Sequence, residues 1–244
     1  MLMAFLSDIH GNLPALEAAI GDAKSRGASR VVCAGDMTGY GPFPDEVCRF
    51  LEDRRIPAIL GNYDKKVIDV AKQRRSAASG MKQKKRKILL WTVTHLDKRS
   101  RGYLEGLPDH LVLRLAGGYS ILVVHGSSIS MDDAIYPSIT QQGLESKLGG
   151  ASPDILVCGH THIPFVKRIG KTLIVNCGST GHPVDGDPRP AYALVYGQAG
   201  DTPRGRIVRF EYDRDRTIAA LEQSSLPKGL RKDFLEGSKM RFLP

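Results

Sequence analysis

The sequence has no apolar run approaching the roughly 20 residues that a membrane-spanning helix needs. Its first apolar run, residues 2–6, is short and lacks the preceding basic segment of a secretory signal peptide. Cysteine is scarce as well, with four in 244 residues and no Cys-x-x-Cys spacing. These features argue against a membrane protein and a disulfide scaffold, and they predict a soluble cytoplasmic protein whose cysteines are buried free thiols.

Acidic residues are missing from one stretch, residues 72–87, although the chain contains 26 of them. This stretch contributes +8 to a net charge of +9. Its basic residues are Lys72, Arg74, Arg75, Lys82, Lys84, Lys85, Arg86 and Lys87. Such a stretch can be a solvated helix face or a mobile insertion, or it can attract phosphate-rich ligands such as nucleic acid. The composition leaves these readings open.

Predicted strands and helices alternate over the first 60 residues. Apolar runs at 2–6, 31–34 and 57–60 predict strands, and the apolar spacing at 14–26 and 44–53 predicts helices. Repeated units of this kind build a parallel sheet.

The three predicted strands end at Asp8, Asp36 and Asn62, which are 28 and 26 positions apart. Because the carboxyl ends of parallel strands share one edge of a sheet, these side chains are expected to meet. His10 lies two residues after Asp8, so extended geometry through this loop would place both side chains on the same side of the backbone.

The rest of the chain changes character twice. Residues 64–106 are predicted to be largely helical, and strand-like runs then dominate. These runs cover residues 111–115, 121–124, 155–158, 173–175, 189–196 and 207–212, with a weak helix at 141–148. We expect one domain over residues 1–244, with 64–106 as a helical, basic insertion and 213–244 as a C-terminal extension.

Polar side chains also follow the later apolar runs directly. His125 comes after one run, His160 and His162 come after the next, and the polar loop 176–179 comes after a third. Each residue alone would be unremarkable, but together they supply several metal-type side chains beside glycines that permit tight turns. Mixed imidazole and carboxylate ligands suit manganese, iron or zinc better than calcium or magnesium.

These motifs resemble those of the calcineurin-like metallophosphoesterase superfamily. The matching segments are, in order, Asp8-x-His10, Gly35-Asp36, Gly61-Asn62, His125 and Gly159-His160-Thr161-His162. Residues 176–192 further resemble the YfcE-like and diadenosine-polyphosphatase-like small phosphodiesterases of bacteria and archaea. The resemblance implies an α/β fold, a four-layer α/β/β/α sandwich of two mixed β-sheets flanked by helices, with one sheet built mostly from each half of the chain.

The resemblance also implies two metal ions bridged by Asp36. Asp8, His10 and His162 would complete one ion. Asn62, His125 and His160 would complete the other. Two ions about 3.5 Å apart can share a hydroxide nucleophile and hold phosphoryl oxygens. Manganese and iron are the expected ions, with zinc, nickel and cobalt as alternatives.

The implied activity is hydrolysis of a phosphodiester or a nucleotide-type substrate, with Asp36, Asn62 and His125 in the catalytic centre. A nuclease is one alternative, for which the basic residues 72–87 argue. A non-catalytic protein-interaction scaffold on the same fold is another, and the full set of coordinating side chains argues against it. No membrane partner is expected, and the sequence does not indicate an oligomeric state.

Tyr63 departs from the superfamily pattern, because many members have a histidine that protonates the leaving oxygen at this position. A phenol with a pKa near 10 is a poorer general acid at pH 7, so we expect a preference for leaving groups that need little protonation. His182 could supply the proton instead. Its alternative reading is a solvated turn before Pro183.

Overall fold

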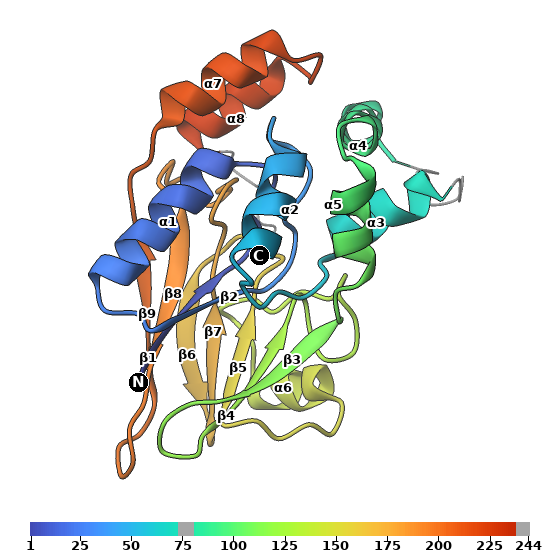
Figure 1. Ribbon diagram of the computed structural model, residues 1–244. Helices are drawn as coiled ribbons and strands as arrows, with labels where there is room; N and C mark the ends of the chain where they lie inside the picture. Colours follow the sequence, from blue (N-terminus) through green and yellow to red (C-terminus); the bar gives the residue numbers. More distant parts are fainter. Residues whose placement is uncertain (73–80, 238–244) are drawn as a thin grey trace.

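The computed structural model describes residues 1–72 and 81–237, which form four layers (Figure 1). Two β-sheets pack face to face, and helices cover the outer face of each sheet. The predicted α/β/β/α sandwich is confirmed. Of the basic stretch 72–87, residues 73–80 lie outside the described residues.

The first sheet combines strands from both ends of the chain. Its strands run in the order β2-β1-β8-β9. They are β1 (Leu2–Leu6), β2 (Arg30–Cys33), β8 (Ala191–Tyr196) and β9 (Arg204–Arg209). β1 pairs in parallel with β2 and antiparallel with β8. The expectation of one sheet from each half is therefore wrong, because two C-terminal strands complete the sheet that β1 and β2 begin.

The second sheet is built from the middle of the chain, in the order β3-β4-β5-β7-β6. Its strands are β3 (His110–Arg114), β4 (Ser120–Val124), β5 (Ile155–Cys158), β6 (Phe165–Ile169) and β7 (Thr172–Asn176). The pairs β4–β5 and β5–β7 are parallel, whereas β3–β4 and β6–β7 are antiparallel. β6 was not predicted, because the adjacent Lys167 and Arg168 interrupt its apolar pattern.

The helices divide unevenly between the two outer faces. The apolar cluster on the outer face of the first sheet includes residues of α1 (Leu13–Ser25), α2 (Pro44–Asp53), α3 (Asn62–Ala71), α4 (Gln83–Thr94), α5 (Lys98–Glu105), α7 (Arg214–Gln223) and α8 (Gly229–Glu236). The second sheet is covered by α6 (Gln141–Leu148). None of these helices in the described part of the chain has the length and apolar character needed to span a bilayer.

β1 shows why the sandwich holds together. Ala4 and Leu6 lie in the apolar cluster with the helices, whereas Met3 and Phe5 lie in the cluster between the sheets, and all four are fully buried. A strand covered on both faces needs this continuous apolar run rather than an alternating pattern. Burial of a side chain as large as Phe5 stabilises the fold by about 1.5–3 kcal/mol.

The predicted strand at residues 57–60 is wrong. Ala58 forms one isolated parallel bridge with Cys33, flanked by hydrogen bonds from Cys33 N to Pro57 O (2.8 Å) and from Ile59 N to Cys33 O (3.1 Å). Pro57 has no N–H to extend the ladder, and Leu60 N donates instead to Pro108 O (2.8 Å). The chain then enters α3 at Asn62.

The last strand and the cysteines were also predicted from the sequence. The last strand lies three residues earlier than predicted, at β9. All four cysteines are buried and unpaired, as predicted; they are Cys33, Cys48, Cys158 and Cys177.

Candidate metal centre

The loops that follow β1 and β2 run side by side beyond the sheet. Asp8 N donates to Gly35 O (3.0 Å), His10 N to Asp36 O (3.0 Å) and Gly11 N to Met37 O (2.8 Å). These bonds continue the parallel pairing of the two strands past their ends. They bring Asp8 and Asp36 together, as the strand-end argument predicted for these two residues, and His10 lies with them.

The backbone at five of the seven candidate ligands is left-handed rather than extended. The φ angles are 53° at Asp8, 48° at His10, 54° at Asp36, 65° at His160 and 59° at His162. Residues other than glycine adopt this region uncommonly, at a cost on the order of 1–3 kcal/mol each, and they do so chiefly at functional sites. The expectation of extended geometry from Asp8 to His10 is therefore wrong, although their side chains still meet.

Two glycines allow the loops to approach this closely. A Cβ at Gly61 would lie 2.1 Å from Asp36 Oδ1. A Cβ at Gly159 would lie 1.9 Å from Ser7 Oγ and 2.5 Å from Asp8 Oδ2. No side chain fits at such distances, so both positions require glycine for steric reasons.

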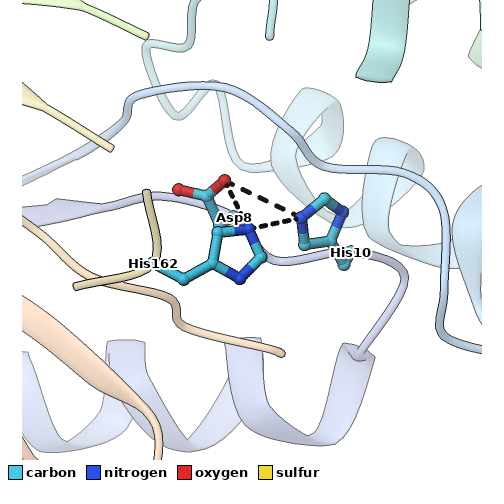
Figure 2. Close-up of side chains that lie close together, drawn as sticks. All are labelled: Asp8, His10 and His162. Atoms are coloured by element: carbon cyan, nitrogen blue, oxygen red, sulfur yellow. Dashed lines mark hydrogen bonds and ion pairs between the residues drawn. The ribbon is translucent and has the colours of Figure 1, made fainter. Parts of the chain in front are cut away.

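Asp8, His10 and His162 form one compact group, whose side chains point toward one another (Figure 2). His162 Nε2 lies 3.1 Å from His10 Nε2 and 3.1 Å from Asp8 Oδ1, and His10 Nε2 lies 3.7 Å from Asp8 Oδ1. Ligands that each lie about 2 Å from one transition-metal ion are separated by such distances. The arrangement can hold one ion.

A second group consists of Asp8, Asp36 and His125. Asp36 Oδ2 lies 3.4 Å from His125 Nε2 and 3.7 Å from His10 Nε2, which belongs to the first group. Asn62 Oδ1 lies 3.2 Å from His125 Nε2. Asp36 thus lies between the two groups, and Asp8 is a member of both.

All three closely grouped histidines are oriented in the same way. Nδ1 of His10, His125 and His162 lies 2.9, 2.8 and 2.6 Å from the backbone oxygens of Thr38, Ala34 and His182, respectively. A neutral imidazole that donates from Nδ1 presents a lone pair at Nε2, which is the arrangement that metal-binding histidines use. Nε2 of His10 and of His125 lies within 4.0 Å of both Asp8 and Asp36, whereas Nε2 of His162 lies beside Asp8.

The two buried carboxylates of the cluster are stabilised by positive charge placed beside them. Burial would raise the pKa of Asp8 and of Asp36, but the neighbouring imidazoles outweigh it and lower both. Burial would lower the pKa of His125, but Asp36 and Asp8 raise it to about 10. Burial lowers the pKa of His10 to about 4, against the opposing influence of Asp36 and Asp8.

Protons or metal ions can supply that charge at the same nitrogen atoms. Asp8 Oδ1 is buried and has no hydrogen-bond partner in the described part of the chain, so it is an acceptor with spare capacity. A buried oxygen of this kind, surrounded by imidazole nitrogens, suits a divalent transition-metal ion. The residues present therefore fit the predicted metal ions.

His160 lies beside the two groups but belongs to neither among the described residues. Its ring centroid is 5.3 Å from that of His125, and its backbone N–H donates to Asp8 Oδ2 (2.9 Å). Burial lowers its pKa. Its assignment as a ligand stays a prediction.

Two supporting carboxylates had no role in the sequence-based reasoning. Buried Asp64 accepts hydrogen bonds from the backbone N–H groups of Gly61 (3.2 Å) and Thr38 (3.0 Å), which joins the Asp36 loop to the start of α3. Asp132 accepts from Asn62 Nδ2 at 2.7 Å. Asp64 could have been suspected from its place in Gly61-Asn62-Tyr63-Asp64. Asp132 follows no apolar run, so its sequence position gave no signal.

His182 lies in the interior, so its reading as a solvated turn is wrong. It is 5% exposed, its ring stacks on Tyr40 with centroids 4.5 Å apart, and its edge meets Phe234 of α8. Burial lowers its pKa well below the usual value, and the neighbouring His162, His10 and Lys84 disfavour a positive charge on it further. The C-terminal helix that excludes water from it is more than 45 residues distant in the sequence.

Tyr63 is also buried beside the cluster. Its backbone N–H donates to Asp36 Oδ1 (2.7 Å), which helps to orient that carboxylate. Its hydroxyl has no hydrogen-bond partner within residues 1–72 and 81–237. Burial raises the pKa of this phenol above its ordinary value, so the hydroxyl stays protonated at neutral pH.

The described chain is thus a layered α/β sandwich with buried imidazoles and carboxylates gathered beyond its strand ends. Residues 1–200 match the family model described as the calcineurin-like phosphoesterase superfamily domain, and the chain belongs to this family of phosphoester hydrolases.

Three similar proteins illustrate the relationship. The phosphodiesterase YfcE of Escherichia coli is 25% identical over 198 residues, which cover 77% of this chain and 84% of that protein. A metallophosphoesterase from Sphaerobacter thermophilus is 26% identical, with a TM-score of 0.76 over 97% of this chain and 99% of that one. A hypothetical protein, PH1004, from Pyrococcus horikoshii shares the fold, with 24% identity and a TM-score of 0.84 over 98% and 99% of the two chains. The predicted resemblance to the superfamily and to its YfcE-like branch is confirmed.

Proposed function

We propose that this protein is a binuclear metal-dependent phosphoesterase that hydrolyses phosphodiester or nucleotide-type substrates. One observation carries the proposal: Asp36 Oδ2 lies between His10 Nε2 (3.7 Å) and His125 Nε2 (3.4 Å), where a bridging carboxylate would stand. Membership of a phosphoesterase family supports it, as does similarity to a protein named phosphodiesterase.

Under this proposal Asp36 would hold both ions. Asp8, His10 and His162 would complete one, and Asn62, His125 and His160 the other. Manganese and iron are the preferred ions for these ligands. When bound, two such ions make water a strong nucleophile at neutral pH and neutralise phosphoryl oxygens.

The protein itself contributes by orienting the imidazoles and the Asp36 carboxylate before a ligand enters. The Nδ1 contacts fix His10, His125 and His162 with Nε2 inward, so little rearrangement is needed when a ligand enters. The Tyr63 backbone N–H holds one oxygen of Asp36 and leaves the other to face the imidazoles. The proposal treats residues 1–244 as one domain, which the apolar cluster shared by both sheets supports.

The proposal is tested with Asp36→Asn. Elemental analysis should find about two ions per wild-type chain, and the variant should lose metal from both sites together with hydrolysis of bis(p-nitrophenyl) phosphate. Asp215→Asn, on the exposed surface of α7, is the matched control. Full metal content and unchanged turnover in Asp36→Asn would refute the bridging role.

The alternatives make different predictions in the same assays. A scaffold would hydrolyse no phosphodiester with any of the metals. A nuclease would prefer long nucleic acid over the small diester, with binding that weakens steeply as salt rises.

A further inference from the structure

A cavity of about 590 Å³ opens beside the candidate metal centre. Five of the seven candidate ligands line it; they are His10, Asp36, Asn62, His160 and His162. The volume is in the range of pockets that hold nucleotide-sized molecules. A ligand whose scissile phosphate lay at the metal centre would therefore extend into this cavity.

Helices α4 and α8 supply one part of the cavity wall. Lys84 and Lys85 of α4 line it, as do Ile88 of α4 and Asp233 of α8. Lys84 Nζ lies 2.8 Å from Asp233 Oδ2, which joins the two helices across the cavity. These lysines belong to the basic stretch 72–87, so part of its charge faces the site.

The two lysines differ in their partners. Lys84 is neutralised in part by Asp233, whereas Lys85 has no ion-pair partner in the part of the chain that the structure describes. Lys66 adds a third ammonium to the lining and is paired with Asp132 (3.0 Å). The wall thus carries more positive than negative charge, outside the metal ligands themselves.

Unpartnered polar groups give independent reason to expect a ligand in this cavity. His182 and Tyr63 line it, and each is more than nine-tenths buried. Neither imidazole nitrogen of His182, nor the hydroxyl of Tyr63, has a hydrogen-bond partner among the described residues. Buried groups of this kind are normally satisfied, so a polar ligand beside them would relieve a cost that the free protein carries.

We propose that this cavity binds a second, non-scissile phosphate of the substrate through Lys84 and Lys85. The substrates would then be compounds with at least two phosphate groups, such as nucleoside polyphosphate esters, in preference to simple diesters. The inference rests on the proposed function, because it takes the scissile phosphate to lie at the metal centre. Lys84 would exchange Asp233 for the phosphate as the ligand enters.

The test compares two nucleotide esters of p-nitrophenol and follows the release of p-nitrophenolate, the bond from phosphorus to the aryl oxygen being the one cleaved in both. One is the p-nitrophenyl ester of thymidine 5′-monophosphate. The other is the γ-p-nitrophenyl ester of thymidine 5′-triphosphate, which adds non-scissile phosphates. The quantity measured is the ratio of kcat/KM for the second ester to kcat/KM for the first.

Removing the cavity charge should lower that ratio. Lys85→Gln, which breaks no ion pair among the described residues, should lower it about tenfold, as expected for loss of one charge-assisted hydrogen bond. Lys82→Gln is the matched control, because Lys82 precedes the same helix but does not line the cavity. An unchanged ratio in Lys85→Gln, or an equal fall in Lys82→Gln, would overturn the proposal.

Asp233→Asn separates a binding role from a structural one. If the Lys84–Asp233 pair merely held α8 in place, Asp233→Asn and Lys84→Gln would lower the ratio alike. If Lys84 binds phosphate, Asp233→Asn removes its competitor and should raise the ratio, whereas Lys84→Gln lowers it. A fall in both variants overturns the proposal.

A second readout does not need turnover. Calorimetric titration of the metal-free protein with thymidine 5′-triphosphate should show binding that Lys85→Gln weakens about tenfold and Lys82→Gln leaves unchanged. Equal binding by wild type and Lys85→Gln would count against the proposal. Failure of the proposed function would look different: wild type would hydrolyse neither ester with any metal.

Discussion

Asp132 determines which end of the Asn62 amide faces the candidate metal centre. Asn62 Nδ2 donates to Asp132 Oδ1 over 2.7 Å, and Asn62 Oδ1 consequently lies 3.2 Å from His125 Nε2. A reversed amide would direct its N–H groups at the site and its oxygen at a carboxylate. Asp132 is thus a positioning residue for a predicted ligand.

Replacement of Asp132 should therefore weaken metal binding without removing a ligand. We expect Asp132→Ala to lower the metal affinity of one site about tenfold. This is at the low end of the effects seen when a residue that orients a metal ligand is removed. Equilibrium dialysis with manganese measures it. Asp133→Ala is the matched control, since Asp133 pairs with Lys147 and not with Asn62. Equal affinities in the two variants would contradict the positioning role.

Gly159→Ala should destabilise the protein by about 2–3 kcal/mol, because the new methyl group would overlap Ser7 Oγ and Asp8 Oδ2. Urea unfolding monitored by circular dichroism gives the change in the free energy of unfolding. Gly21→Ala in α1, where the methyl group meets nothing within 4 Å, is the control and should stabilise by up to about 1 kcal/mol. A Gly159→Ala protein as stable as wild type would show that the loops separate at little cost.

Tyr63→Phe should leave the free energy of unfolding unchanged or raise it by up to about 1 kcal/mol. The hydroxyl that it removes is buried, with no hydrogen-bond partner in the described ranges. Tyr192→Phe provides the contrast, because the buried Tyr192 donates to Asp22 Oδ2 (2.7 Å) and its loss should cost about 1 kcal/mol. A large loss of stability in Tyr63→Phe would reveal a partner for this hydroxyl.

Hydrolysis should depend steeply on the leaving group. Burial raises the pKa of Tyr63, which makes this phenol a still weaker proton donor than in water. A series of aryl phosphodiesters should give a steep fall in kcat/KM as the pKa of the leaving phenol rises, and Tyr63→His should make that fall shallower. If only His182→Ala altered the slope, Tyr63 would not be the cause of the selectivity.

Asp187 should make stability depend on pH in the acid range. Hydrogen bonds from Arg189 lower its pKa to about 2, below the value near 3.9 of an unfolded chain. A lowered carboxyl pKa stabilises the folded state above the unfolded value, and this contribution disappears as the pH falls through the folded value. The difference in the free energy of unfolding between wild type and Asp187→Asn should therefore shrink between about pH 5 and pH 2. Urea unfolding at a series of pH values checks it, and Arg189→Gln should reduce the dependence without abolishing it, because the backbone N–H of residue 189 and the Arg209 guanidinium still lower the pKa of Asp187.

The strand-end reasoning located the candidate site because it depends on local sequence. An apolar run that stops at Asp8 or Asp36 gives both a strand and the edge at which it ends. The same reasoning failed for residues 57–60, because one apolar run in this chain makes a bridge and not a strand. Whether a run becomes a strand depends on the partner that lies beside it.

Relationships between distant residues were the ones that the sequence could not supply. The burial of His182 depends on Phe234 and Tyr40, and neither can be assigned to it from sequence spacing. The amide of Asn62 is set by Asp132, 70 residues away. The antiparallel pairing of β8 with β1 joins residues about 190 positions apart, and neither apolar run by itself indicates the other as its partner.

The central position of β1 has a consequence for the order of folding. Its partner β8 begins at Ala191, and the backbone N–H groups of Thr180 and Gly181 donate to Ser7 O (2.8 Å) and Asp8 O (3.0 Å). Until the ribosome has delivered these residues, the first strand has one open edge and the loop that carries Asp8 lacks two of its supports. Contacts of such long sequence separation form late and slow the folding rate. The nascent chain should therefore acquire the final geometry of its candidate metal ligands only after Thr180, Gly181 and β8 have emerged from the ribosome.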